Sequence, residues 1–167
     1  GYGAVQTPNL DRLASRGVTF SQAYCPAPLC NPSRAAVLTG YYPTTSGVYK
    51  NAEDWRVAVP EAVSLPELFK DNGYHTVGGG KILHWNDRAI WDEYYPRIAD
   101  PEPTAEVQQS EDNSSGVLSW GSVDVPDEEL NDHRITSWAA DYLHAQHDSP
   151  FFLADGVFRP HVPLACP

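Results

Sequence analysis

The residues with the clearest capacity for chemistry are Cys30 and Arg34, which lie four positions apart at the expected start of a helix. Pro32 suits the first turn of that helix, because proline lacks a backbone N–H and has its φ angle preset. Residues 33–38 would form the helix body and Gly40 its end. A helix start attracts anions through its free N–H groups and dipole, and Arg34 adds a fixed positive charge. The pattern predicts a nucleophile beside a site for a tetrahedral oxyanion, although an inert buried cysteine is the commoner fate of a lone thiol.

The segment before Cys30 should hold one helix and one strand. Thr7 and Pro8 form a helix start and Gly17 a helix end. Residues 18–24 are then typical of a short extended segment. Cys30 would therefore follow a strand and open a helix.

The downstream sequence continues this alternation. Ser64 to Glu67 form a capping box, and the helix that they begin should end at Gly73. A strand is predicted from residue 74 to about 78, and the next helix from about 128 to 146. Residues 151–157 are mostly apolar, as expected of a strand buried on both faces of a sheet.

This order predicts an α/β layered fold, in which sites cluster beyond the carboxyl ends of parallel strands. The 167 residues have the length of one domain or part of one. Residues from about 92 to 127 are rich in proline and acids, which predicts a surface insertion. A disordered linker is the competing interpretation, but Trp91, Tyr94, Tyr95 and Trp120 offer apolar surface that could dock the segment onto a core.

Composition excludes several classes of function. The 167 residues are 41% hydrophobic and 20% charged, with a formal net charge of −11, which argues against a nucleic-acid-binding surface. No run approaches the roughly 18 apolar residues of a membrane span. Cys25, Cys30 and Cys166 are too few for a disulfide framework or a four-ligand zinc site. A bridge between Cys25 and Cys166 stays open.

The string from Cys30 to Gly40 resembles the hallmark of the sulfatase family, Cys-x-Pro-Ser-Arg followed by a short apolar helix and Leu-Thr-Gly. The resemblance implies that Cys30 is oxidised to formylglycine, whose hydrated aldehyde is the nucleophile. It also implies a fold of alkaline phosphatase type, with a mixed, mostly parallel sheet between helices, and makes residues 1–167 part of a sulfatase catalytic domain. A formylglycine-generating enzyme is implied as a partner. Tyr41 departs from the pattern, because the family usually has arginine after Leu-Thr-Gly.

Two further segments resemble the iduronate-2-sulfatase-like subgroup. Residues 80–84 are similar to its Gly-Lys-x-His motif in a spacing longer by one residue, and residues 151–163 to its strand and loop with a substrate-binding histidine. The resemblance implies catalytic roles for Cys30, Arg34, Lys81 and His84, and sulfate or substrate binding by Lys81 and His161. Taken alone, Lys81 is more typical of a solvated surface lysine. A surface-facing histidine is the alternative interpretation of His161.

The resemblance also implies a divalent cation, with Ca²⁺ expected. Cys30, as formylglycine, would be one ligand, and the family's other metal ligands, two aspartate-containing pairs, have no match in this chain. Calcium takes about six to eight oxygen ligands, so one formylglycine is not enough. The chain is therefore expected to be an inner piece of a longer sulfatase and to be inactive alone. By resemblance, that protein would be periplasmic, secreted or lysosomal.

The function predicted from these residues is sulfuric ester hydrolysis, with a sulfated saccharide or another sulfated small molecule as substrate. A phosphate or phosphonate ester hydrolase of the same superfamily is one alternative, and a non-catalytic protein that binds sulfated glycans is another. Residues 55–57, Trp-Arg-Val, also resemble the subgroup near its substrate. A packed tryptophan beside an exposed arginine explains them equally well.

Overall fold

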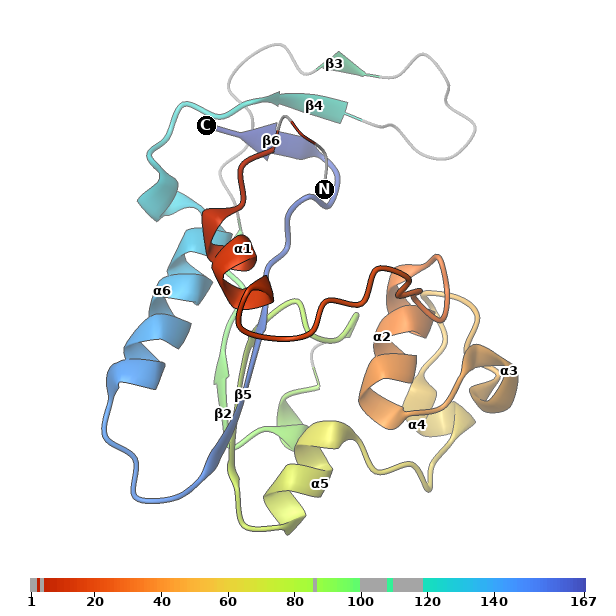
Figure 1. Ribbon diagram of the computed structural model, residues 1–167. Helices are drawn as coiled ribbons and strands as arrows, with labels where there is room; N and C mark the ends of the chain where they lie inside the picture. The colour runs from red at the N-terminus through yellow and green to blue at the C-terminus, as the bar shows by residue number, and fades with distance from the viewer. Residues whose placement is uncertain (1–2, 4, 86, 100–107, 110–118) are drawn as a thin grey trace.

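The computed structural model describes residues 3, 5–85, 87–99, 108–109 and 119–167 (Figure 1). The helices are α1 (Pro8–Ala14), α2 (Cys30–Thr39), α3 (Pro43–Ser46), α4 (Trp55–Ala58), α5 (Leu65–Asp71) and α6 (Asn131–His144), with 3-10 turns at Arg88–Ile90 and Asp127–Glu129. The strands are β1 (His75–Gly80), β2 (Glu93–Tyr95), β3 (Gln108–Gln109), β4 (Ser119–Ser122), β5 (Phe151–Gly156) and β6 (Leu164–Cys166). None of the helices in these ranges is long and apolar enough to cross a membrane.

The main sheet has the order β2-β1-β5, and all of its strands are parallel. Gly80 at the end of β1 pairs with Gly156 at the end of β5, so the residues that follow these strands emerge at one edge. A smaller sheet, β3-β4-β6, combines one antiparallel and one parallel pairing. The predicted mixed, mostly parallel sheet with helices is confirmed. The main sheet places Lys81 beside the loop after β5.

Helices cover both faces of β1, and glycines let aromatic rings lie directly on that strand. A Cβ atom at Gly79 would come within 2.8 Å of the Trp138 ring of α6, and one at Gly78 within 2.8 Å of the Trp91 ring. On the Trp91 side, Phe69 of α5 stacks on Phe152 of β5 at 4.4 Å between ring centroids. The sequence Gly78-Gly79-Gly80 is thus a packing requirement as well as a lead into the site.

Two apolar clusters hold α2 in place. The first lies among α2, α4 and the loops beside them, and its members are Ala35, Val48, Trp55, Val59 and Ala62. The second joins α2 to the main sheet, because Tyr94 of β2 and Phe152 of β5 pack against it; its members are Leu38, Leu83, Ile90 and Trp91. Helix α2 is therefore fixed relative to the main sheet.

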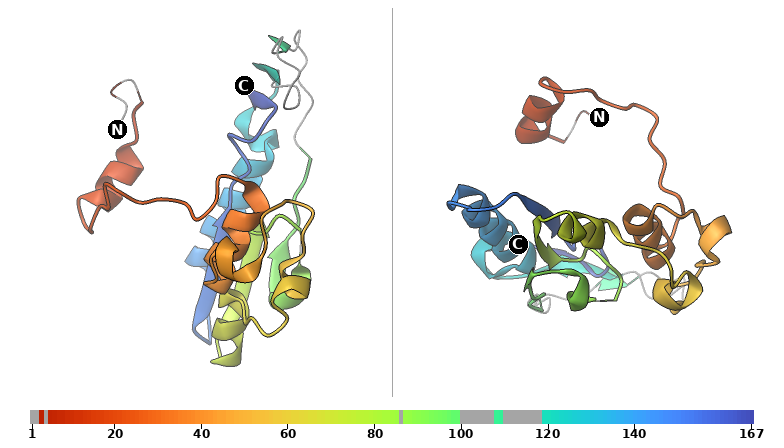
Figure 2. Two further views of the ribbon diagram at one scale, coloured as in Figure 1. Left: turned by 90° about the vertical axis from the view of Figure 1, so that its right-hand side faces the viewer. Right: turned by 90° about the horizontal axis from the view of Figure 1, so that it is seen from below.

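The segment before α2 differs from the sequence prediction. Residues 18–24 form no strand, and Val18, Phe20 and Tyr24 are 79 to 85% exposed. A strand is stable only when a neighbouring strand takes up its hydrogen bonds, and no described strand pairs with this segment. The prediction that Cys30 directly follows a strand was wrong. Helix α1 starts at Pro8 as predicted, but it stands apart from the sheet (Figure 2).

Three other expectations need adjustment. The predicted strand at 151–157 exists as β5, but it is half-buried, because it is an edge strand of the described sheet. The helix expected from about 128 to 146 is divided into a 3-10 turn and α6. The region from 92 to 127 begins with β2, which belongs to the main sheet. The rest of the predicted insertion falls largely on residues 100–107 and 110–118, outside the described residues.

The Asp92 carboxylate ties α5 to β1 and should make stability depend on pH. The Lys70 Nζ atom lies 2.6 Å from Asp92 Oδ1, and the N–H of Thr76 donates to Oδ2 at 2.9 Å. Lys70 and then Thr76 lower the pKa of Asp92 to about 2, from its usual 3.8. Because the folded state favours the carboxylate, this stabilisation is complete above about pH 4 and is lost as the pH falls through 2.

We expect Asp92→Asn to lower the free energy of unfolding by about 1 kcal/mol near neutral pH, after allowance for solvent screening. The difference from the unsubstituted protein should shrink as the pH approaches about 2. Urea denaturation across that pH range measures it. Asp71→Asn, which removes an exposed carboxyl with no ion pair among the described residues, is the control. A loss of the same size at every pH would contradict the role of the charge.

Candidate active site

Cys30 is the first residue of α2, half-buried at the N-terminal end of the helix. Gly40 follows the last turn with φ of 76°, and its N–H donates to the carbonyl of Ala36 at 2.9 Å. A left-handed residue at this position ends a helix, and glycine adopts it without a steric penalty. The predicted helix is present, with Cys30 at its start, Pro32 in its first turn and its stop at Gly40.

Asn31 anchors this helix start from the inside, a role that the sequence analysis missed. Its side chain is almost fully buried, and its Nδ2 donates to the carbonyls of Lys50 and Glu53 at 2.9 and 2.7 Å. Its backbone N–H donates to Asn51 Oδ1 at 3.0 Å. The only signal in the sequence is an amide next to the cysteine, and amides are common at helix starts for other reasons.

Replacing Asn31 by Ala should destabilise the protein by about 2 to 4 kcal/mol, because a buried side chain loses its hydrogen bonds to two backbone carbonyls. Denaturant unfolding of the protein measures the loss. Asn72→Ala is a matched control, since Asn72 also donates to a carbonyl, that of Leu68 at 2.8 Å, but is exposed. Equal effects of the two substitutions would show that burial of Asn31 contributes nothing.

Lys81 directly follows β1, at a point where the chain after β1 comes very close to the backbone of Gly156 at the end of β5. Gly80 has φ of 74°, a region that favours glycine, and the hydroxyl of Tyr94 donates to its carbonyl. The N–H of Lys81 donates to the carbonyl of Gly156 at 2.7 Å. A Cβ atom at Gly156 would lie 2.5 Å from the Lys81 carbonyl carbon. Both glycines are therefore needed to place Lys81.

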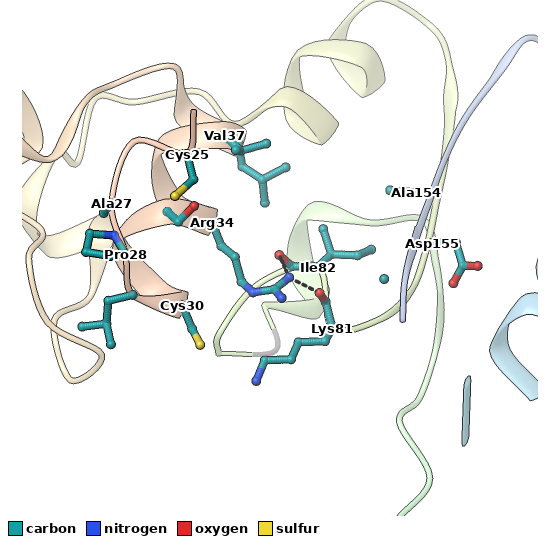
Figure 3. A pocket seen from close by; sticks show the side chains of 14 residues that line it. Cys25, Ala27, Pro28, Cys30, Arg34, Val37, Lys81, Ile82, Ala154 and Asp155 are labelled. Carbon is teal, nitrogen blue, oxygen red and sulfur yellow. Dashed lines mark hydrogen bonds between the residues drawn. The ribbon is translucent and has the colours of Figure 1, made fainter. Parts of the chain in front are cut away.

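Arg34 connects the helix start to this turn. Its Nη1 atom donates to the carbonyl of Lys81 and, at 3.2 Å, to that of Ile82, as the dashed lines of Figure 3 show. The resemblance implied a catalytic role for Arg34. In the described residues its hydrogen bonds go to backbone carbonyls, so the guanidinium positions Lys81 relative to α2.

One cavity brings several of the predicted residues together. It has a volume of about 640 Å³, and Cys30, Arg34 and Lys81 all line it (Figure 3). Its remaining walls come from the loop before α2, from α2 and from the ends of β1 and β5. His84 and His161 do not line it. The cavity thus holds a nucleophile at a helix start together with two cations, the arrangement predicted for an oxyanion site.

The positive charges of this region act on each other. Burial lowers the pKa of Lys81, as do the charges of Arg34 and Arg97, while Cys30 acts in the opposite direction. Burial also lowers the pKa of His84, and the charges of Lys81, Arg34 and His161 add to the effect. The imidazole of His84 is therefore held neutral at a higher acidity than usual, and a neutral imidazole can accept a proton. Its Nδ1 atom is buried and has no hydrogen-bond partner among the described residues.

The loop after β5 carries His161 and is held by α6. The two carboxylate oxygens of Asp132 accept hydrogen bonds from the backbone N–H groups of Phe158 and Arg159 at 2.7 and 2.8 Å. His161 stacks on the Phe158 ring with 4.6 Å between centroids, and its Nδ1 lies 2.7 Å from the carbonyl of Val162. His161 is thus placed by local contacts beside the cations, and its charge reaches His84.

Asp155 is a wall residue of the cavity that the sequence analysis did not select. Burial and the negative charge of Asp132 raise the pKa of this carboxyl group. The signal that could have found it is its place at the end of β5, where it pairs with Gly79 just before the Lys81 turn. Sites in parallel α/β sheets collect at such strand ends.

Trp55 and Arg56, by contrast, have structural roles. Trp55 is buried in the cluster beneath α2, and the Arg56 guanidinium lies 4.5 Å from its ring centroid. Arg56 also forms ion pairs with Glu67, at 3.1 Å, and with Asp87. The packed tryptophan considered in the sequence analysis is observed, and its arginine is satisfied by two carboxylates.

A calcium ion does not fit the described residues alone. They contain no group of three or more His, Cys, Asp and Glu side chains that could hold a metal. Among the cavity residues, Asp155 has the one carboxylate, and its side chain points away from Cys30 (Figure 3). Calcium needs about six to eight oxygen ligands, so these residues are insufficient.

The chain belongs to the sulfatase family, because the family model described as Sulfatase matches residues 1–167. A protein named Sulfatase from Formosa agariphila is 38% identical over 184 residues, which cover 99% of this chain and 36% of that protein. Iduronate 2-sulfatase from Homo sapiens is 32% identical over 185 residues, which cover 100% of this chain and 33% of that protein. The chain spans about a third of the length of these curated relatives.

Solved structures with the same fold support the architecture. The phosphonate monoester hydrolase of Agrobacterium radiobacter aligns with a TM-score of 0.70 at 21% identity, covering 100% of this chain and 38% of that one. BT4656, in complex with its substrate D-glucosamine-2-N,6-O-disulfate, aligns with a TM-score of 0.60 at 20% identity, covering 98% and 30%. At these identities the likeness is one of fold.

Proposed function

We propose that the protein containing this chain hydrolyses sulfuric esters, with formylglycine made from Cys30 as the nucleophile. The observation that carries this proposal is the common cavity of Cys30, Arg34 and Lys81 at the start of α2. One hydroxyl of hydrated formylglycine would attack sulfur, and the bond from sulfur to the ester oxygen would break, so that the alcohol leaves. Deprotonation of the second hydroxyl would then expel sulfate and restore the aldehyde. Membership of the sulfatase family supports the same chemistry.

The residues around the cavity would divide the remaining work. Lys81 would bind a sulfate oxygen, and the helix start would favour the negative charge that develops during transfer. Arg34 would act through Lys81, since its hydrogen bonds hold the carbonyls of Lys81 and Ile82. The family's divalent cation, with Ca²⁺ expected, stays outside these roles, because the described residues do not form its site.

His84 would accept a proton, and His161 would contact the substrate near the bond that breaks. His84 would take the hydroxyl proton when sulfate is expelled, which suits an imidazole whose pKa is lowered by burial and neighbouring cations. His161 would contact the sulfate or the bridging oxygen, and its stacking on Phe158 supports a fixed ring position.

The substrate class that we favour is a sulfated saccharide. Iduronate 2-sulfatase is among the relatives that match the whole chain, and a structure of the same fold holds a disulfated glucosamine. A uronate 2-sulfate is the most specific form of this proposal. The formylglycine-generating enzyme would be the partner that converts Cys30.

The test uses the full-length protein from a host that matures other sulfatases. The peptide that contains Cys30 should weigh about 18 Da less than the unmodified form, and the protein should release sulfate from a sulfate ester. Cys30→Ala should abolish that release, whereas Cys25→Ala, at the other free cysteine in the cavity, should leave the mass change intact.

Other results would overturn the proposal. Faster release from phosphate or phosphonate esters than from sulfate esters would assign the protein to the phosphoryl branch of the superfamily. An unmodified thiol with retained affinity for sulfated glycans would make it a binding protein.

A further inference from the structure

Phe158 carries a second cation, Arg97, beside the Lys81 that lines the cavity. The Lys81 Nζ atom lies 4.5 Å from the centroid of the Phe158 ring, and the Arg97 Cζ atom lies 3.7 Å from the same centroid. The two cations are therefore no farther apart than the sum of these distances, about 8 Å. Two cations within this limit are close enough to contact two anionic substituents of one sugar ring.

The charge of Arg97 is not neutralised within the described part of the chain. None of the ion pairs there includes Arg97, and its side chain is exposed. Arg56, in contrast, pairs with two carboxylates. An aromatic ring holds a guanidinium in place but leaves its N–H groups available, so Arg97 can still bind an anion.

The start of α6 holds both segments of this arrangement. Asn131 Oδ1 accepts the backbone N–H of Ile98 at 2.8 Å, next to Arg97. The neighbouring Asp132 accepts the N–H groups of Phe158 and Arg159. Because adjacent residues of one helix fix both backbones, Arg97 and Phe158 are placed relative to each other before any substrate binds. A group ordered in advance binds with a smaller entropic cost.

We propose that Arg97, held over Phe158, binds a second anionic group of the substrate, a carboxylate or a second sulfate on the sugar that carries the scissile sulfate. The inference rests on the proposed function and narrows its substrate class to saccharides with two negative groups. Lys81 would take the scissile sulfate and Arg97 the other group. Arg97 would then determine specificity and take no part in bond cleavage.

Binding to the full-length protein with Cys30→Ala tests this, because no turnover can occur. Calorimetry would use two pairs of probes, a uronate 2-sulfate with its methyl ester, and glucosamine N,6-disulfate with N-acetylglucosamine 6-sulfate. Each pair differs by one anionic group. Arg97→Gln should weaken binding of a dianionic probe by about tenfold or more and that of its monoanionic partner by less than about twofold. Arg97→Lys should restore part of the loss.

The two pairs separate the possible sources of the second charge. Loss confined to the uronate pair identifies a carboxylate, and loss confined to the glucosamine pair identifies a sulfate. Arg16→Gln is the control, since Arg16 follows α1, apart from the sheet (Figure 2), and the substitution removes the same charge. Equal losses within each pair, no loss, or failure of the dianionic probes to bind would overturn the inference. A different outcome is that the protein with Cys30 intact releases no sulfate although the Cys30→Ala variant binds the dianionic probes selectively. That result would contradict the proposed hydrolysis and leave the inference about Arg97 standing.

Discussion

Lys81→Met should lower kcat for a sulfate ester by about 10²- to 10³-fold, while the protein still folds. The side chain lines the cavity beside Cys30, and methionine keeps its length without its charge. Hydrogen-bond donors aimed at developing negative charge contribute more to the transition state than to substrate binding. The loss should therefore fall mainly on kcat, with a smaller change in KM.

Lys50→Met is the matched control for that experiment. It removes the same charge. Lys50 accepts a hydrogen bond from Asn31 through its backbone carbonyl, so replacing its side chain leaves that bond to α2 in place. We expect its rate to stay within about twofold of the original. Steady-state kinetics at several salt concentrations measures both variants. Equal losses would mean that net charge, and not the position of Lys81, determines the rate.

Gly156→Ala should disrupt the same site without touching a charged group. The added methyl would lie 2.5 Å from the carbonyl carbon of Lys81 and 2.8 Å from the N atom of Ile82, both backbone atoms. Backbone atoms cannot rotate out of the way, so the strand ends must separate. We expect a loss of about 1 to 3 kcal/mol in the free energy of unfolding. We also expect a loss of about 10²-fold or more in kcat/KM, since misplacement by about 1 Å can have that effect.

The control for Gly156 is Gly17→Ala, where the nearest atom, the Leu13 carbonyl oxygen, would lie at an ordinary 3.6 Å from the new methyl. This variant should match the original in stability and rate. Denaturant unfolding and kinetics on the same preparations separate the two effects. Full activity of Gly156→Ala would show that the close approach to Lys81 is not required.

Local signals predicted the starts of α2 and α5. Pro32 and Gly40 define where a helix can begin and end, and the capping box at Ser64 is observed, with Glu67 Oε2 accepting from its N–H at 2.9 Å. These features depend on neighbouring residues in the chain, so the sequence contains the information. The α/β class followed from the same alternation of signals.

What depends on distant partners could not be predicted in the same way. Residues 18–24 have the composition of a strand, but pairing decides whether a strand forms, and none occurs among the described residues. The hydrogen bonds of Asn31 to Lys50 and Glu53 join residues about twenty positions apart. Arg97 was equally invisible, because only the folded chain brings it to Phe158. The type of a side chain alone does not show which distant residue it will contact.

The start of α6 has a consequence for how substrate preference can diverge between related proteins. The first two residues of α6 hold the segments around Arg97 and Phe158 by accepting hydrogen bonds from backbone N–H groups, those of Ile98, Phe158 and Arg159. Every amino acid except proline has that N–H group, so the side chains at positions 97 and 158 can be replaced while these hydrogen bonds are retained. If Arg97 binds substrate as proposed, selection at these two positions, in nature or in a randomised library, would alter which sugar is accepted while the backbone contacts to α6 stay in place.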